Sequence, residues 1–244
     1  MPLGLTGFDK RALAGATVLV GIDEAGRGCL AGPVVAAAVL CRAEFYSTSW
    51  CRRHSRGVDD SKRLTPARRA EIVQRFREAC HEKWIRIGIG SADIAEIERF
   101  NIYQANTLAM RRAVASLSDL SDLSGLSDLS DNSAMDQPVI LIDGKPIRNF
   151  PLPHRGVVKG DRKSLAVALA GIHAKEWRDT RMREMDKAFP DYGFAVHKGY
   201  GTRQHLEAIR RLGPCPHHRR TFLRRILEVP DEAADATQCS LFEQ

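Results

Sequence analysis

Four acidic residues stand where predicted apolar strands end, an unusual place for a charged side chain. Asp23 and Glu24 follow the apolar run 17–22, Asp143 follows the run 139–142, and Asp161 ends the run 157–161. If these strands are neighbours, their acids converge on one edge of the sheet, where crowded carboxylates repel and raise one another's pKa. A divalent cation removes that conflict, and oxygen ligands suit Mg²⁺ or Mn²⁺. One such Asp alone is better explained as a turn former or helix cap, but three strand ends in a basic chain favour a metal site.

A short glycine loop follows the first acidic pair. Gly26 and Gly28 flank Arg27, and glycines let a backbone approach a sugar–phosphate closely and present N–H donors to it. Taken alone, the same three residues describe a tight turn with a surface arginine. Beside Asp23 and Glu24 they favour chemistry on a phosphodiester, in which two cations about 4 Å apart activate a water and stabilise the leaving oxygen.

Strands and helices must hold these residues in place. The sequence predicts strands at 17–22, 33–40, 84–90, 139–144 and 157–161, the first two as a hairpin. Helical spacing of apolar side chains predicts helices at 66–84, 101–117, 164–187, 202–211 and 218–227. Mixed strands followed by helices, arranged on one sheet, indicate an α/β or α+β fold.

The composition narrows the class of protein. The chain has 244 residues, of which 43% are hydrophobic and 27% charged, with a formal net charge of +7. These values exclude a disordered or collagen-like chain and allow one domain with its own core. No apolar run reaches the roughly 18 residues of a membrane span, and no secretory signal is visible, so we expect a cytoplasmic protein without a membrane partner. The excess of basic over acidic residues suggests an anionic partner, although net charge alone does not identify that partner.

Cysteine usage predicts a reduced intracellular protein. The six cysteines show no paired spacing of the kind found in zinc knuckles or thioredoxin-like sites. Cys215, His217 and His218 suggest a zinc site, but prolines break this segment and no second ligand pair stands at a suitable distance.

Three segments lie outside the predicted catalytic domain or interrupt it. Residues 118–131 read SDLSDLSGLSDLSD, and a period of three gives neither a strand nor a helix a clean buried face. We expect a low-complexity loop insertion at 118–133, with an acidic calcium or partner site as the alternative. We expect an N-terminal extension at 1–15 and a flexible acidic tail at 229–244, which leaves a domain at 16–228.

Seven blocks of the sequence, in order, resemble the bacterial ribonuclease HII family, the type 2 ribonucleases H. They are GIDEAGRGCLAGPVVAAAV (21–39), DDSKRLTPARR (59–69), NIYQANTLAMRRA (101–113), LIDG (141–144), VVKGDRKS (157–164), AKEWRD (174–179) and DYGFAVHKGYGTRQHLEAI (191–209). The resemblance implies a ribonuclease H-like fold, a mixed β-sheet flanked by helices with a C-terminal helical extension. It implies a metal-dependent endoribonuclease that hydrolyses the RNA strand of RNA–DNA hybrids. It further implies incision 5′ to single ribonucleotides in duplex DNA, leaving 5′-phosphate and 3′-hydroxyl ends.

The resemblance also implies roles for single residues. The ligands of two Mg²⁺ or Mn²⁺ ions would be Asp23, Glu24, Asp143 and Asp161. The loop that contacts the ribose 2′-hydroxyl, the group that separates RNA from DNA, would be Gly26, Arg27 and Gly28. Tyr200 would stack on the sugar that follows the ribonucleotide, although it also fits a half-buried aromatic at a strand end. The candidate phosphate contacts, each equally well explained as a solvated charge, are Lys159, Lys198 and Arg203.

The sequence departs from the family pattern at 169–179. Gly171 stands inside a predicted helix, which costs about 1 kcal/mol relative to Ala, and Glu176 replaces an apolar residue. We expect these changes to affect packing near Asp161. Two other functions fit the same features: a different two-metal nuclease or transposase-like enzyme, and a non-catalytic hybrid-binding protein.

The end of the tail suggests a protein partner. Gln238, Leu241 and Phe242 resemble the short motif by which bacterial proteins dock on the replication sliding clamp, with Cys239 in place of the usual Leu. A frayed terminus is the alternative. We otherwise expect a monomer whose partners are RNA–DNA hybrids and ribonucleotide-containing duplexes.

Overall fold

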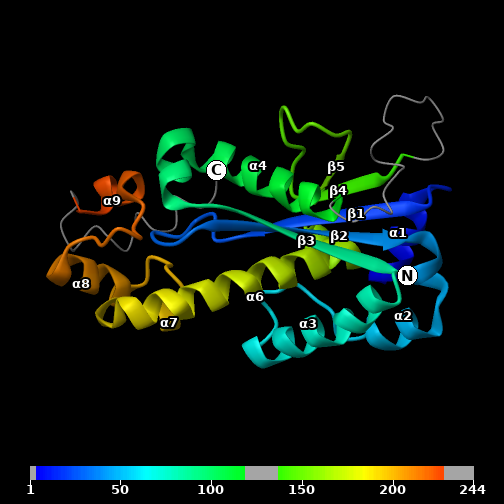
Figure 1. Cartoon of the computed structure of the whole chain (residues 1–244), viewed down its shortest axis with the longest axis horizontal. Coiled ribbons are helices and arrows are strands. Elements are labelled where there is room, and N and C mark those ends of the chain that lie inside the picture. Colours follow the sequence, from blue (N-terminus) through cyan, green and yellow to red (C-terminus); the bar gives the residue numbers. More distant parts are fainter. Residues whose placement is uncertain (1–3, 119–136, 228–244) are drawn as a thin grey trace.

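A mixed five-stranded sheet forms the centre of the described protein (Figure 1). The structure, a computed structural model, describes residues 4–118 and 137–227. The strands are β1 (Val18–Ala25), β2 (Val34–Arg42), β3 (Ile85–Ala92), β4 (Val139–Asp143) and β5 (Arg155–Val157), in the order β3-β2-β1-β4-β5. β2 pairs antiparallel with β1 and β3, whereas β4 pairs parallel with β1 and β5. The predicted hairpin and mixed sheet are confirmed.

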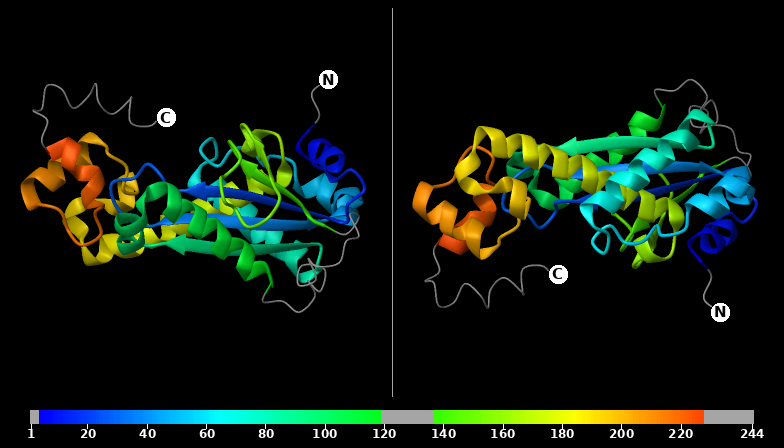
Figure 2. Two further views of the ribbon diagram at one scale, coloured as in Figure 1. Left: turned by 90° about the horizontal axis from the view of Figure 1, so that it is seen from above. Right: turned by 90° about the horizontal axis from the view of Figure 1, so that it is seen from below.

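Helices cover both faces of this sheet. α4 (Ile94–Ser118) packs on β2 and β3 from one side, and α6 (Leu165–Ala188) packs on β1 and β2 from the other, beside α3 (Pro66–His81) (Figure 1). The C-terminal helices lie together at one end of the molecule, and α1 lies at the opposite end (Figure 2). The remaining helices are α1 (Leu5–Leu13), α2 (Ser49–His54), α7 (Phe194–His197), α8 (Arg203–Leu212) and α9 (Arg220–Leu227), with 3₁₀ turns η1 (Ala43–Ser47), η2 (Gly160–Arg162) and η3 (Pro190–Tyr192).

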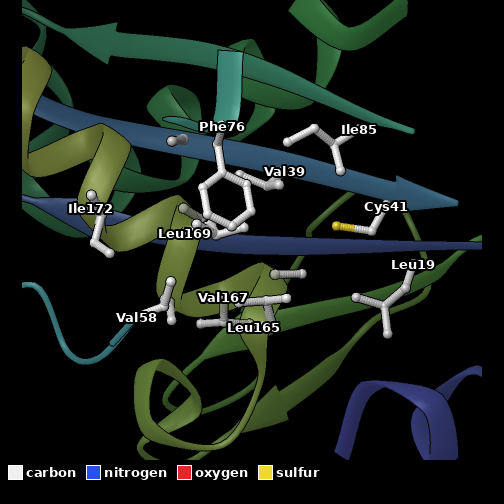
Figure 3. Packing of buried hydrophobic residues seen from close by; sticks show 14 of the residues in the cluster. Leu19, Val39, Cys41, Val58, Phe76, Ile85, Leu165, Val167, Leu169 and Ile172 are labelled. Atoms are coloured by element: carbon white, nitrogen blue, oxygen red, sulfur yellow. The ribbon is translucent and has the colours of Figure 1, made fainter. Parts of the chain in front are cut away.

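The side chains of the buried strands alternate between the two faces of the sheet, and each face carries a hydrophobic core. Leu19, Val39 and Cys41 face α6 and α3, where they meet Phe76 and Leu169 (Figure 3). The intervening residues of β1 and β2 pack against α4 on the other face of the sheet. Successive side chains of a strand point to opposite faces, so a strand with helices on both sides is apolar throughout. This explains why β1 and β2 appear as continuous apolar runs.

The prediction that Val157–Asp161 is a strand is wrong. β5 ends at Val157, and Asp161 lies in the 3₁₀ turn η2. Lys159 adopts a left-handed conformation (φ 57°), which is incompatible with a continuing strand. The chain therefore turns before it reaches Asp161, and this acid enters the site from a turn.

The segments outside the predicted domain are only partly described. Residues 5–13 of the predicted N-terminal extension form α1, which packs against α6. Nearly all of the predicted insertion 118–133 lies outside the described residues, as does the tail 229–244 with Gln238, Leu241 and Phe242. In the part that is described, no helix combines the length and the apolar character that a membrane crossing requires.

Asp9 on α1 gives a stability prediction. Its carboxylate is fully buried and accepts a hydrogen bond from the Ala166 N–H (3.1 Å), and burial raises the pKa of Asp9 to about 6 from 3.8. The folded state then binds this proton more tightly than the unfolded state, so its contribution to stability falls as pH rises from about 4 to 6. We expect Asp9→Asn to gain about 3 kcal/mol relative to the wild type between pH 4 and pH 7. Urea unfolding of both proteins across this range measures the difference, and parallel stability profiles would contradict it.

Candidate active site

The pairing of β1 with β4 brings two of the predicted acids side by side. Ile22 pairs with Ile142, so Asp23 and Asp143 each stand one residue further along adjacent parallel strands. Both follow the strand alternation onto the face covered by α6, whereas Glu24 lies on the α4 face. Asp161 joins them from η2, close enough to influence the charge of Asp23.

Backbone amides orient two of these carboxylates. The Glu24 N–H donates to Asp23 Oδ1 (2.7 Å), and the Gly160 N–H donates to Asp143 Oδ1 (2.6 Å). The second bond ties the turn that carries Asp161 to the end of β4. These short contacts fix one oxygen of each carboxylate and leave the other for a further partner.

The four acids form one electrostatic group. Burial raises the pKa of Asp23 well above its usual range, and the carboxylates of Glu24, Asp143 and Asp161 raise it further. Burial also raises the pKa of Glu24, although Arg27 opposes the shift, and burial together with Asp143 raises the pKa of Asp161. The candidate metal ligands of this group are all carboxylate oxygens. A hard divalent cation would neutralise the repulsion among them. The donor set therefore fits Mg²⁺ or Mn²⁺.

Residues 4–118 and 137–227 contain no preformed set of metal ligands. Nowhere in these ranges do three Asp, Glu, His or Cys side chains already stand as a set that could hold an ion. The zinc alternative gains no support, because His218 Nδ1 instead accepts the Cys215 N–H (3.0 Å) and its Nε2 contacts His205 Nε2 (3.0 Å).

The glycine loop lies directly beyond the first acidic pair. Gly26 has φ +87°, and a Cβ there would clash with the Arg178 side chain, so its backbone has room for glycine only. The exposed side chain of Arg27 brings Nη1 to 3.6 Å from Glu24 Oε1. Gly28 is half-buried. The loop thus places its main-chain groups and the Arg27 guanidinium at the border of the acidic group.

Comparison with known proteins identifies the family. The family model described as Ribonuclease HII matches residues 20–226. The chain belongs to the ribonuclease HII family. Ribonuclease HII of Geobacillus kaustophilus (strain HTA426) is 42% identical over 221 residues, covering 90% of this chain and 74% of the relative. The chain is accordingly a metal-dependent endoribonuclease of the ribonuclease H type, a phosphodiester hydrolase that acts on RNA–DNA hybrids.

Solved structures share the fold at lower sequence identity. A structure of the PCNA:RNase HII complex from Archaeoglobus fulgidus gives a TM-score of 0.61 at 22% identity and covers 83% of this chain and 93% of the other. Bst-RNase HIII in complex with Mn²⁺ gives a TM-score of 0.58 at 18% identity and covers 96% of this chain and 73% of the other. The predicted ribonuclease H-like fold with its C-terminal helices is confirmed.

Tyr200 lies between the glycine loop and α6. Its side chain is partly exposed, while its hydroxyl lies beside the Cys29 thiol, and burial raises the pKa of Tyr200 to about 12. The ammonium of Lys175 stands 5.5 Å from the ring centroid. A neutral, partly exposed aromatic ring in this position can stack on a sugar.

The three candidate phosphate contacts differ in their surroundings. Lys159 is exposed two residues before Asp161. Lys198 donates its ammonium to the Ala195 carbonyl (2.6 Å), and burial lowers the pKa of Lys198. Arg203 projects from the start of α8 and pairs with Glu207 (2.8 Å). Of the three, Lys159 is the one that stands beside the acidic group.

Sequence reasoning missed several polar residues around the acids. Lys62 lies close enough to Glu24 and Asp161 to oppose the rise of both pKa values. The buried Asn106 side chain hydrogen-bonds to Glu24, and its Oδ1 has no partner within the described residues. Arg162 pairs with the buried Asp60 (2.9 Å) and so ties η2 to the segment before α3. The DDSK and NIYQAN blocks contain Lys62, Asp60 and Asn106. The sequence therefore marked these segments as similar to the family, but it assigned no role to the individual residues.

The expected effect of Gly171 requires correction. A Cβ at this position of α6 would strike the carboxylate of Asp23, whereas we expected altered packing near Asp161. The absence of a side chain lets α6 pass directly beneath the end of β1. Gly171 therefore creates space at Asp23.

Proposed function

We propose that this enzyme incises duplex DNA 5′ to single embedded ribonucleotides, as well as the RNA strand of hybrids, with two Mg²⁺ or Mn²⁺ ions. The observation that carries the proposal is the glycine loop at the border of the four-acid group. The N–H groups of Arg27 and Gly28 meet no acceptor among the described residues, so they are available to a 2′-hydroxyl oxygen. A site that recognises a single 2′-hydroxyl does not require a second ribonucleotide next to it.

Each element of the site has a distinct task in this proposal. Asp23, Glu24, Asp143 and Asp161 hold the cations, which supply charge for activating a water and for stabilising the leaving 3′-oxygen. The Arg27–Gly28 backbone fixes the ribose, and the partly exposed ring of Tyr200 supports the following sugar. Lys159 and Arg203 contact phosphates and position the duplex. Hydrolysis leaves a 5′-phosphate on the ribonucleotide and a 3′-hydroxyl upstream.

End-labelled duplexes test the proposal. We expect the wild-type enzyme with Mg²⁺ or Mn²⁺ to cut a DNA duplex containing one ribonucleotide on its 5′ side and to leave an all-DNA duplex intact. Chelation of the metal abolishes cutting, and re-addition restores it. Cleavage of long hybrids alone, or incision on the 3′ side of the ribonucleotide, would contradict the proposed specificity.

Other parts of the proposal concern the setting of the enzyme. We propose that residues 16–228 form the catalytic domain and act as a monomer in the cytoplasm, where the free thiols of the described cysteines, Cys29, Cys41, Cys51, Cys80 and Cys215, remain reduced. We also propose that Gln238, Leu241 and Phe242 dock on a sliding clamp. The complex of an archaeal relative with PCNA supports a clamp partner for the family.

A further inference from the structure

Two buried arginines lie beneath the glycine loop. Arg178 of α6 and Arg219, just before α9, are both completely inaccessible to solvent. Within the described residues neither side chain forms an ion pair, and both direct their donors to backbone carbonyls. Burial lowers the pKa of Arg219 to about 10, which still leaves it charged at neutral pH. Burying two charges without carboxylates is costly, so their contacts require an explanation.

Arg219 holds the carbonyl side of the glycine loop. Its Nη2 donates to the Gly26 carbonyl (2.8 Å) and its Nη1 to the Arg27 carbonyl (2.9 Å). Nε and Nη2 both donate to the Gly32 carbonyl (3.0 and 2.8 Å). The Phe222 ring lies 5.4 Å from the guanidinium carbon. The planar, five-donor guanidinium is the side chain that can join three carbonyls at once.

These contacts determine where the loop amides point. In a trans peptide, the carbonyl of one residue and the N–H of the next lie in the same plane and point in opposite directions. When the carbonyls of Gly26 and Arg27 point toward Arg219, the N–H groups of Arg27 and Gly28 must point away from it. Neither of these two N–H groups has an acceptor among the described residues.

Arg178 joins the residues that directly follow the glycine loop to the segment that carries Tyr200. It donates to the carbonyls of Ala31 (2.9 Å), Pro33 (3.0 Å) and Lys198 (2.8 Å). Beside it, the Leu30 N–H donates to the Gly199 carbonyl (2.8 Å). Gly199 has φ +80°, and a Cβ there would come within 2.5 Å of the Ala31 carbonyl. The glycine loop and the Tyr200 segment therefore share one support.

We propose that Arg219 and Arg178 are positioning residues, which set the amides of the glycine loop and its distance from Tyr200 and so determine discrimination for the 2′-hydroxyl. The inference rests on the proposed function, because it assumes that this loop contacts the ribose. Neither arginine touches the substrate. Each arginine acts by holding backbone carbonyls with its guanidinium group. When the guanidinium is lost, the peptide planes of the loop are free to rotate.

Lysine variants test the inference while preserving the buried charge. The measurement is the ratio of cleavage rates for two duplexes that differ in one atom group, with either a ribonucleotide or its 2′-fluoro analogue at the scissile position. This ratio is unaffected by a loss of folded enzyme, since such a loss lowers both rates equally. We expect Arg219→Lys and Arg178→Lys each to reduce the ratio about tenfold, because a lysine ammonium replaces several charge-assisted bonds by one.

Arg75→Lys is the matched control. Arg75 of α3 also donates to a backbone carbonyl, that of His54 (3.1 Å), but it holds a different part of the chain. We expect this variant to keep the wild-type ratio. A wild-type ratio near one would overturn the proposed reading of the 2′-hydroxyl itself. A high wild-type ratio that both lysine variants retain would overturn the role of the arginines alone, and so would failure of both variants to fold, since the arginines would then serve only as scaffold.

Discussion

Asp23→Asn lowers the cleavage rate by at least about 1000-fold, while the variant still binds the hybrid. Asp23 is the most deeply buried acid of the site and is influenced by the other three carboxylates. An amide in its place keeps the shape but removes one negative charge from the group that holds the cations. Metal-assisted stabilisation is worth several kcal/mol, and each 1.4 kcal/mol of barrier is tenfold in rate. Single-turnover cleavage of a labelled hybrid measures the loss.

Binding is expected to behave differently from cleavage in this variant. Phosphate contacts supply most of the affinity of such complexes, and removal of a carboxylate near the scissile phosphate reduces repulsion. We therefore expect the hybrid Kd of Asp23→Asn, measured by fluorescence anisotropy, to stay within about threefold of the wild type. Asp191→Asn, at an exposed position in η3, is the control and retains full activity. Full activity of Asp23→Asn would exclude a role of this acid in holding metal.

The acidic site was predictable because its signal is local. A charged residue directly after an apolar strand has no packing role, so Asp23 and Asp143 could be recognised before the strands were known to be neighbours. Asp161 was recognised as an acid but assigned to the wrong element, since the left-handed turn at Lys159 has no strong sequence signature. α1 and α2 were missed because both are short, and their stability depends on tertiary packing.

The support of the site was not predictable in the same way. Arg178 and Arg219 contact residues about 150 and 190 positions away in the chain. An arginine in a basic chain is usually a solvated charge, and nothing in its neighbours indicates complete burial. The same holds for three buried histidines in the C-terminal part, His197, His205 and His218. Their roles follow from the meeting of distant segments.

Two of these histidines, His205 and His218, form a hydrogen-bonded chain behind Tyr200. His205 Nδ1 lies 2.8 Å from the Tyr200 carbonyl, and its Nε2 lies 3.0 Å from His218 Nε2. Because a carbonyl only accepts, His205 carries its proton on Nδ1, and His218 must then donate from Nε2. The Cys215 N–H donates to His218 Nδ1 (3.0 Å), which requires that nitrogen to be unprotonated. Every partner is therefore satisfied when both rings are neutral.

We expect this neutral pair to make the enzyme acid-sensitive. Burial, together with the nearby His197, lowers the pKa of His205 to about 3 and that of His218 to about 4. The unfolded chain, with pKa values near 6.5, binds these protons more tightly, so stability falls as pH decreases from 6.5. Between pH 7.5 and pH 5 each ring contributes a loss of up to about 2 kcal/mol. A proton on either ring would also set two N–H groups against each other.

His218→Gln isolates this effect. The glutamine amide can still donate to His205 Nε2 but cannot bind a proton, and it loses the bond from the Cys215 N–H. We expect the variant to be less stable than the wild type at pH 7.5 yet to lose about 2 kcal/mol less on going to pH 5. His81→Gln, on the exposed end of α3, serves as the control and follows the wild-type slope. Urea unfolding of the three proteins at both pH values gives six free energies, and equal slopes for wild type and His218→Gln would show that the pair does not resist protonation. Because His205 holds the Tyr200 carbonyl, the same titration should first loosen the segment that contacts the proposed substrate.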